Sequence, residues 1–260
     1  MELLERDRLE ERLAAGELAD WKATRYRTFR ETMTDEAAPY PCYFAVEAQR
    51  KGDFRYVFPE SPIDEEALAE LVEPLTEFLE RYERFGEYPS LVVLFRPPEE
   101  DPAVADEPST EAYKRQFWSV LRYLQANDPE PWPASVPTDP DHPKWQYCFA
   151  GEPTFLVGRA PFYERRRSRF TPHGLEITVQ PWGIFEGLTG LDDDGQEART
   201  IIRDRLAAYD DVEMHPDAGD FVDSRKREWK QYMLPETNAE SVARCPLYER
   251  TDVEGSRRDR

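Results

Sequence analysis

Apolar side chains recur at helical spacing in three stretches of the chain, residues 64–82, 110–124 and 198–209. Residues 61–64 hold a serine, an early proline and an aspartate, which is typical of a helix start and predicts where the first helix begins. Pro74 lies inside that helix. Because proline lacks the amide proton of a helical hydrogen bond, we expect it to kink or split the helix.

Short apolar or alternating runs predict β-strands around these helices. Residues 91–95 form a continuous apolar run, which suits a strand buried on both faces. Residues 175–179 alternate, which suits a strand with one buried face. Helices and strands intermix without a regular period, so the pattern predicts an α+β fold, a single domain with a mixed β-sheet flanked by helices. The other predicted strands are residues 42–46, 54–58, 145–150 and 154–157.

The distribution of charge and proline divides the chain into three parts. Residues 1–38 are charged and compatible with helix, but their apolar face is thin, so we expect an N-terminal helical arm that packs on something larger. Residues 39–250 hold the predicted strands and form the main domain. Residues 251–260 are expected to be a disordered tail. Between residues 128 and 143, six prolines predict a stiff, extended connector.

The composition of the 260-residue chain excludes several classes of protein. It has 54 acidic and 34 basic residues, a formal net charge of −20, and such a surface should repel nucleic acid and anionic lipid. No apolar run is long enough for a transmembrane helix, and the charged N-terminus lacks the apolar core of a secretory signal. The three cysteines lie far apart and form no disulfide framework. We therefore expect a cytoplasmic protein.

Lysine is scarce in this chain. Only six of the 34 basic residues are lysines, and this scarcity together with excess carboxylate suggests a high-salt cytoplasm, where ions screen the self-repulsion of the surface. In dilute buffer the same repulsion should destabilise the folded state. We expect the melting temperature to rise with KCl concentration, and a melting curve that ignores KCl would contradict this interpretation. The alternative is an ordinary acidic protein.

The densest candidate site is residues 141–169, which combine aromatic residues with an arginine cluster. The common signatures of nucleotide, zinc-protease and serine-hydrolase sites are absent. Arginines gathered in a chain of net charge −20 suggest a bound carboxylate or phosphate, held through forked hydrogen bonds. Alternatively, they pair with nearby aspartates and glutamates. The candidate residues are Arg165, Arg166 and Arg169.

Two histidines, one cysteine and two glutamates are further candidates. His142 and His215 each precede a proline, which restricts the backbone and suits a fixed ligand, although a lone histidine often serves as a hydrogen-bonded structural residue. Cys148 lies between aromatic residues and is expected to be buried and inert. Glu152 follows a glycine between two predicted strands, where it would pair with a cationic group or bond a backbone amide. Glu228 and Tyr232 are four residues apart, so a helix would place them on one face.

Eight short motifs occur in order between residues 41 and 246. They are PCYFA, HPKWQYCFAGEP, APFYERRRSR, VQP, IIRDRLAAYD, HPDAGDF, EWKQY and CP. In this order the chain resembles the YqcI/YcgG family over most of its length. The resemblance implies a haem-dependent oxygenase, with haem b as cofactor, that N-hydroxylates a guanidino group of arginine or a related small metabolite. It also implies dioxygen or peroxide as oxidant and an electron donor as partner.

The resemblance implies an axial histidine ligand for the iron, with His142 as the first candidate and His215 as the second. Trp145 and Phe149 would line an apolar haem slot. Glu152 or Glu228 would bind a guanidinium and orient one nitrogen toward the iron. The haem propionates or a substrate carboxylate would be held by Arg165, Arg166 and Arg169.

Two positions depart from the family's pattern. Trp182 follows the Gln-Pro pair where the family usually has arginine, and Tyr163 stands where the arginine motif often has histidine. If that histidine binds iron elsewhere, Tyr163 would have to replace it, and Cys148 is a further candidate. Two other functions stay open, a non-catalytic haem-binding or haem-sensing protein and a cofactor-free structural α+β domain.

Overall fold

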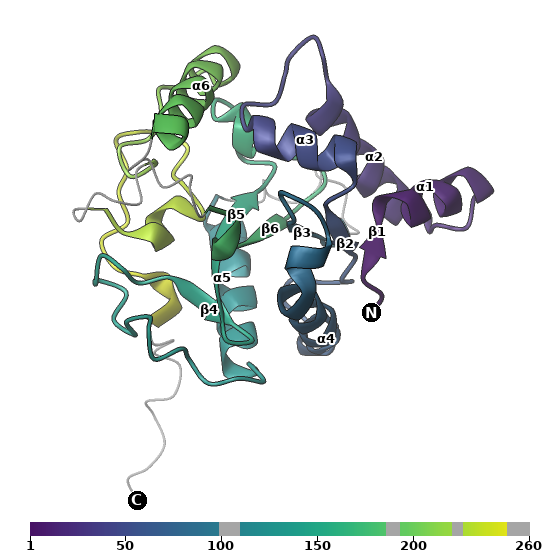
Figure 1. Cartoon of the computed structure of the whole chain (residues 1–260), viewed down its shortest axis with the longest axis horizontal. Helices are drawn as coiled ribbons and strands as arrows, with labels where there is room; N and C mark the ends of the chain where they lie inside the picture. The colour runs from purple at the N-terminus through teal and green to yellow at the C-terminus, as the bar shows by residue number, and fades with distance from the viewer. Residues whose placement is uncertain (99–109, 186–192, 220–225, 249–260) are drawn as a thin grey trace, which may run out of the picture.

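The computed structural model describes residues 1–98, 110–185, 193–219 and 226–248. Six strands form one sheet in the order β1-β2-β3-β6-β5-β4, which runs between two groups of helices (Figure 1). Strands β2 and β3 are parallel and the other described neighbours are antiparallel, so the sheet is mixed, as predicted. The strands are β1 (Leu4–Glu5), β2 (Arg55–Val57), β3 (Leu91–Leu94), β4 (Tyr147–Phe149), β5 (Glu152–Arg159) and β6 (Glu176–Pro181).

One face of the sheet is covered by α4 (Glu65–Arg81) and α5 (Thr110–Ala126). Leu91 and Val93 of β3 belong to the apolar core on this face, since every second residue of a strand points to the same side. The predicted start of α4 is confirmed, because the Asp64 carboxylate accepts hydrogen bonds from two amides of the first turn. The apolar stripes that predicted both helices are thus the surfaces that pack on the sheet.

The opposite face is covered by α1 (Arg6–Ala15), α2 (Asp20–Thr34) and α3 (Tyr43–Lys51). Val92 and Leu94, the alternate residues of β3, belong to this second apolar core. All four residues of β3 are therefore buried, which confirms the two-sided burial expected from the continuous apolar run.

The predicted N-terminal arm, residues 1–38, is built into the fold. Strand β1 pairs with β2 at one edge of the sheet. In α2, the rings of Tyr26 and Phe29 pack against the ring of Tyr56 in β2, with centroids 5.3 and 5.9 Å apart. The arm is thus part of the layer that covers the sheet. The predicted tail, residues 251–260, lies outside the described residues.

A buried ion pair lies on this second face of the sheet. Arg159 of β5 and Glu176 of β6 are opposite each other in the strand register, and their charged groups meet at 2.6 Å. Arg25 of α2 donates a hydrogen bond to the carbonyl oxygen of Leu175 beside them, at 2.7 Å. The Tyr40 ring contacts the Arg159 guanidinium at 5.6 Å. The pairing offsets part of the cost of removing both charges from water.

The C-terminal part of the chain runs along the outer edge of β5. The amide of Gly158 donates to the carbonyl oxygen of Tyr232 at 2.7 Å, beyond the end of the short strand β4. A Cβ at Gly158 would lie 2.5 Å from the sulfur of Met233, so a larger residue there would force the Met233 side chain to move. The remaining elements are α6 (Asp193–Tyr209) and the 3-10 turns η1 (Tyr82–Arg84), η2 (Arg167–Arg169), η3 (Trp182–Phe185), η4 (Glu228–Gln231) and η5 (Pro246–Tyr248).

The strand predicted at residues 42–46 is wrong, and of the kink or split predicted at Pro74 the split is wrong. Residues 42–46 do not form a strand, because helix α3 begins at Tyr43 and ends before Gly52, whose φ is 83°. The aromatic residues there favour a strand locally, but the helix buries Ala48 in the second apolar core and lets Gln49 accept a hydrogen bond from Tyr56 of β2. Pro74 does not split α4, which is continuous and buries this proline. The apolar face on either side of Pro74 holds the helix together through its contacts with the sheet.

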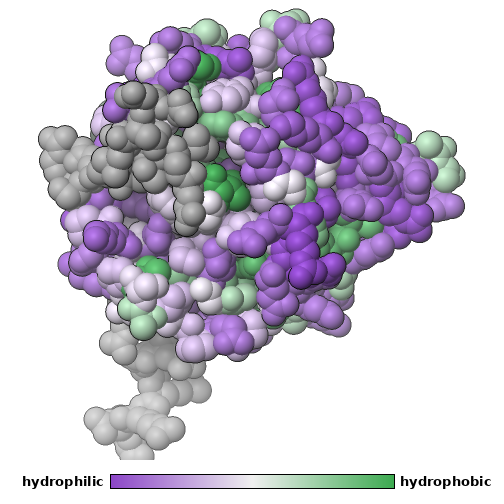
Figure 2. Space-filling view, in the orientation of Figure 1, coloured by the Kyte–Doolittle hydropathy of each residue, from purple (hydrophilic) through white to green (hydrophobic). Residues whose placement is uncertain are grey.

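The face of the molecule shown in Figure 2 is mostly hydrophilic, in keeping with the net charge of −20. Exposed ion pairs such as Lys51–Glu87 and Arg81–Glu77 occur on the surface, but pairs in contact with water contribute little to stability. No helix in the described part of the chain is both long enough and apolar enough to cross a membrane.

Candidate functional site

A buried carboxyl group with neutral partners lies where β4 and β5 meet the C-terminal segment. Glu228, the first residue of η4, is 8% exposed. One of its oxygens accepts a hydrogen bond from the indole nitrogen of Trp182 at 2.8 Å, and the other is bonded by the Tyr232 hydroxyl. No cation offsets the lost hydration of a charged carboxylate among these partners. Burial therefore raises the pKa of Glu228 to about 8, so its protonated form predominates at neutral pH.

Tyr232 can serve Glu228 in both protonation states. The Tyr232 oxygen accepts a hydrogen bond from the amide of Tyr147 at 3.2 Å and lies 3.4 Å from the carbonyl oxygen of Thr154. When Glu228 is charged, the phenol donates to it. When Glu228 is protonated, the carboxyl donates to the phenol oxygen and the phenol turns toward Thr154. The pair can therefore take up or release one proton without leaving a donor unpaired.

Glu152, the other predicted catalytic residue, lies near turn η3, which holds Trp182. The Tyr82 hydroxyl donates to it over 3.3 Å, and burial raises the pKa of Glu152. Tyr82 also approaches Gly183 so closely that a Cβ there would lie 2.3 Å from the Tyr82 oxygen. Turn η3 thus contacts Glu228 directly, through the indole of Trp182. It reaches Glu152 only indirectly, because Gly183 of η3 lies against Tyr82, whose hydroxyl donates to Glu152.

Aromatic rings pack against Tyr232 and Trp182, the two partners of Glu228. The Phe155 ring lies 5.7 Å from that of Tyr232 and 6.1 Å from that of Phe185. Cys148 lies on the neighbouring strand β4, where burial and the nearby charge of Glu228 raise the pKa of its thiol to about 12. The thiol is therefore protonated at neutral pH, and this wall of the site is uncharged.

The structure places neither predicted iron ligand in this cluster. His142 is exposed in a turn, where its Nδ1 accepts a hydrogen bond from the amide of Lys144. His215 is buried, with Nε2 3.1 Å from the carbonyl oxygen of Glu240 and Nδ1 accepting from the amide of Asp217. Burial lowers the pKa of His215, so the ring is neutral. Both nitrogens of His215 are engaged, and those of His142 lie at the surface.

The arginines of the predicted anion site bond to the protein itself. Each of the three donates to backbone carbonyl oxygens of the segment that follows α6, and none of these bonds is to a carboxylate. These hydrogen bonds join the loop after β5 to the C-terminal segment. The arginine cluster therefore has a structural role in this acidic chain. The acceptors are the carbonyls of Asp211 for Arg165, of Pro235 for Arg166, and of Gln231 and Tyr232 for Arg169.

Tyr163, the proposed substitute for a histidine ligand, takes part in the same connection. It is fully buried, and its hydroxyl donates to the carbonyl oxygen of Leu234 at 2.6 Å. Burial raises the pKa of this phenol. In this arrangement the phenol is a hydrogen-bond donor that holds the C-terminal segment in place.

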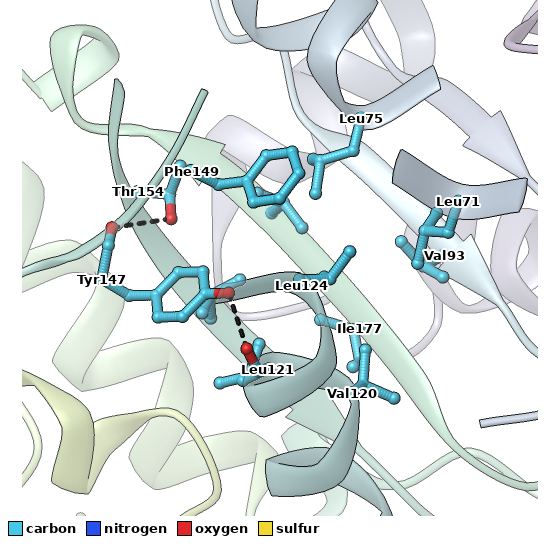
Figure 3. A pocket seen from close by; sticks show the side chains of 12 residues that line it. Leu71, Leu75, Val93, Val120, Leu121, Leu124, Tyr147, Phe149, Thr154 and Ile177 are labelled. Carbon is cyan, nitrogen blue, oxygen red and sulfur yellow. Dashed lines mark hydrogen bonds between the residues drawn. The ribbon is translucent and has the colours of Figure 1, made fainter. Parts of the chain in front are cut away.

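The two aromatic residues predicted to line a haem slot lie in different places. Phe149 points toward α4 and α5, where it borders with Leu75 a cavity of about 10 Å³ (Figure 3). Its lining is almost entirely apolar and its volume is about that of one water probe, so it is a small gap in the core. Trp145 lies 6.1 Å from the ring of Trp132 and 6.4 Å from that of Tyr232. Trp145 therefore borders the Glu228 cluster, and Phe149 does not.

The described residues do not fit a haem group. Haem requires an axial donor and a largely apolar slot, and small-molecule sites have volumes of roughly 300–1,000 Å³. A cavity beside Gln180 and Phe185 has about 30 Å³. A cavity of about 410 Å³ between α3 and α6 is lined largely by charged side chains, with neither histidine nor cysteine. Within the described ranges no three histidine, cysteine or acidic side chains form a metal-binding group. Haem b stays a prediction, with no ligand assigned.

Sequence reasoning paired Glu228 with Tyr232 but missed the other partners that define this site. Tyr232 was within reach of the sequence pattern, since it follows Glu228 by one helical turn. Trp182 gave no such signal, because 46 positions separate it from Glu228 and only the fold joins them. Tyr82 and Gly183 were missed for the same reason.

The chain belongs to the YqcI/YcgG family, whose model matches residues 29–248. This confirms the resemblance inferred from the ordered motifs. Two relatives come from Bacillus subtilis (strain 168). The uncharacterized protein YcgG is 37% identical over 231 residues, which are 89% of each chain. The uncharacterized protein YqcI is 34% identical over 230 residues, which are 88% of this chain and 89% of the relative.

A third relative, from Streptomyces lavendulae, carries the name of an enzyme. It is called "Putative N(omega)-hydroxy-L-arginine synthase DcsA", and it is 31% identical over 236 residues, which are 89% of this chain and 85% of the relative. No solved structure matches the chain.

Proposed function

We propose that this protein N-hydroxylates the guanidino group of arginine or of a related small guanidino compound. The name of the S. lavendulae relative supports this reaction class. The observation that carries the proposal is Glu228, a buried carboxyl group whose two hydrogen-bond donors are both neutral. The charged form of such a carboxyl group is stabilised most by a ligand that is itself positively charged.

A guanidinium has the right charge and shape for this position. Each oxygen of Glu228 accepts one bond from the protein, and a carboxylate oxygen can accept a second. A planar guanidinium can form two parallel hydrogen bonds with a carboxylate, and guanidinium groups also stack on aromatic faces. The arrival of the guanidinium would lower the pKa of Glu228 and drive the proton from the carboxyl. Glu228 then fixes which nitrogen is presented to the oxidant.

The reaction adds one oxygen atom to a nitrogen. With peroxide, one oxygen atom enters the N–OH bond and the other leaves as water. With dioxygen, the second oxygen atom becomes water only if a donor supplies two electrons and two protons. No haem site is found among the described residues, so haem b as the group that activates the oxidant stays an expectation from the family resemblance. The described residues contribute binding and orientation of the guanidinium, and a proton store in the Glu228–Tyr232 pair.

Glu228→Gln tests the role of the carboxyl. Glutamine keeps the shape and can still accept from Trp182 and Tyr232, but it cannot carry the negative charge. We expect kcat/KM for conversion of arginine to a product heavier by one oxygen to fall at least 100-fold, measured by mass spectrometry with hemin and either peroxide or a reductant. Glu77→Gln, an exposed glutamate of α4, is the matched control and should leave the rate unchanged.

Two outcomes would contradict the proposal. One is a Glu228→Gln variant that turns over arginine at the wild-type rate. The other is a wild-type protein that converts no guanidino compound although it binds hemin. An absorption spectrum after hemin titration separates these cases from a protein without haem, since a colourless protein would remove the cofactor that the resemblance implies.

A further inference from the structure

A cavity of about 410 Å³ lies outside the Glu228 site, between α3, α6 and residues 33–39 at the end of α2. Figure 1 shows α3 and α6 at the same end of the molecule, and the ring of Tyr43 in α3 contacts the guanidinium of Arg205 in α6 at 5.5 Å. The volume falls within the range of small-molecule sites, roughly 300–1,000 Å³. No residue that lines this cavity takes part in the Glu228 cluster.

The lining carries charges of both signs. Three carboxylates and two guanidiniums border the cavity, so the net charge of its walls is 2 − 3 = −1. Charges of both signs in one cavity suit a ligand that itself carries both, and the complementary ligand has a net charge of +1. The charged residues are Asp35, Glu36, Glu47, Arg50 and Arg205.

Arg205, Asp35 and Glu36 are the charged lining residues that form no ion pair within the described part of the protein, although the Asp35 carboxylate accepts hydrogen bonds from the amides of Ala37 and Ala38. Arg205 is half-buried and touches the face of Tyr43, but no described side chain or carbonyl accepts a hydrogen bond from it. Glu36 forms no ion pair within the described ranges. The neighbouring Arg50, by contrast, is paired with Glu47 at 3.2 Å. The cavity thus offers a ligand one cation and two carboxylates that form no described ion pair.

We propose that this cavity binds a cationic α-amino acid, a molecule with one carboxylate, one ammonium and a positively charged side chain. Its carboxylate would bond to Arg205, since a half-buried guanidinium favours a carboxylate in forked geometry. Its positive groups would lie against Asp35 and Glu36, the lining carboxylates that form no described ion pair. The site is separate from the reaction at Glu228, and the inference does not depend on the proposed oxygenation.

Isothermal titration calorimetry of the full chain with free L-arginine tests this site. Arg205→Gln should weaken binding at least tenfold, and Arg205→Lys, which keeps the charge, should restore part of it. Arg203→Gln is the matched control, because Arg203 is exposed on the same helix and does not line the cavity. Agmatine, which lacks the carboxylate, should bind wild type and Arg205→Gln equally. Glu36→Gln should weaken both ligands.

The result that would overturn the proposal is equal arginine affinity for wild type and Arg205→Gln, with melting curves showing both to be folded. A second measurement separates this proposal from the function proposed above. In Glu228→Gln we expect arginine still to bind while turnover is lost. Loss of arginine binding in Glu228→Gln would locate the amino acid at Glu228 and contradict a site at α3 and α6. If the wild-type protein shows no turnover, the calorimetric test still applies, because it measures the binding of arginine and not its conversion.

Discussion

Two glutamates are buried in the described part of the fold, and they differ in what surrounds their charge. Glu176 meets the guanidinium of Arg159 at 2.6 Å, with Arg25 close by. Glu228 has only the indole of Trp182 and the phenol of Tyr232. Strand β6 joins the two regions, since Glu176 is its first residue and Trp182 follows its last.

The contrast separates a structural carboxylate from a candidate functional one. At Glu176 the protein supplies the cation, so the charge is already balanced and the pair joins strands β5 and β6. At Glu228 the protein supplies hydrogen bonds without a charge, so the carboxyl is protonated until a cation arrives. A buried acid of this second kind is where a cationic ligand has the most to gain, which is why the proposed chemistry is placed there.

The largest effect is expected at the structural pair. Glu176→Gln leaves the buried guanidinium of Arg159 without its counter-charge and should lower the free energy of unfolding by about 3–5 kcal/mol. Urea denaturation at pH 7 measures it. Glu77→Gln removes an exposed partner of Arg81 and should cost less than about 1 kcal/mol. If Glu176→Gln and Glu77→Gln lost the same free energy of unfolding, the buried Arg159–Glu176 pair would contribute no more to stability than an exposed pair.

The next effect concerns the pH dependence of stability. The folded pKa of Glu228, about 8, lies above its ordinary value of 4.5, so the folded state holds a proton that the unfolded chain has released. Its contribution is therefore fully present below pH 4.5 and is lost as the pH rises toward 8. Between pH 5 and 7 the loss is roughly 3 kcal/mol.

Glu228→Gln isolates this contribution. The difference in unfolding free energy between wild type and Glu228→Gln, measured by urea denaturation at several pH values, should shift steadily against wild type from pH 5 to 7. Other titrating groups cancel in the difference. Parallel curves for the two proteins would mean that Glu228 titrates normally, and the contrast with Glu176 would lose its electrostatic basis.

A smaller effect tests the contact between turn η3 and Tyr82. Gly183→Ala places a methyl group against the Tyr82 hydroxyl and should cost about 1–3 kcal/mol, as overpacking does. Tyr82→Phe removes that hydroxyl, so the double variant should lose much less than the sum of the single ones. Thermal unfolding of the four proteins forms the cycle. Additive losses would mean that Tyr82 does not press on Gly183.

Much of the fold follows from local patterns. The stripes in α4 and α5 and the continuous apolar run of β3 predicted elements that the structure confirms, because burial of an apolar face is strong enough to fix both kinds of element. Residues 42–46 show the limit. A short aromatic run suits either a strand or the first turn of a helix, and the structure has helix α3 there, with Gln49 hydrogen-bonded to Tyr56 of β2.

For the site, the sequence determined the chemical inventory. It supplied an acidic surface, the ordered family motifs, and Glu228 with Tyr232 one turn away. Only the tertiary structure decided which hydrogen bonds form. Trp182 donates to Glu228, both nitrogens of His215 have hydrogen-bond partners, and the arginine cluster donates to backbone carbonyls. Partners of this kind lie far apart along the chain. Burial, which sets whether a carboxyl is charged and whether a ring nitrogen is free, is a property of the whole fold.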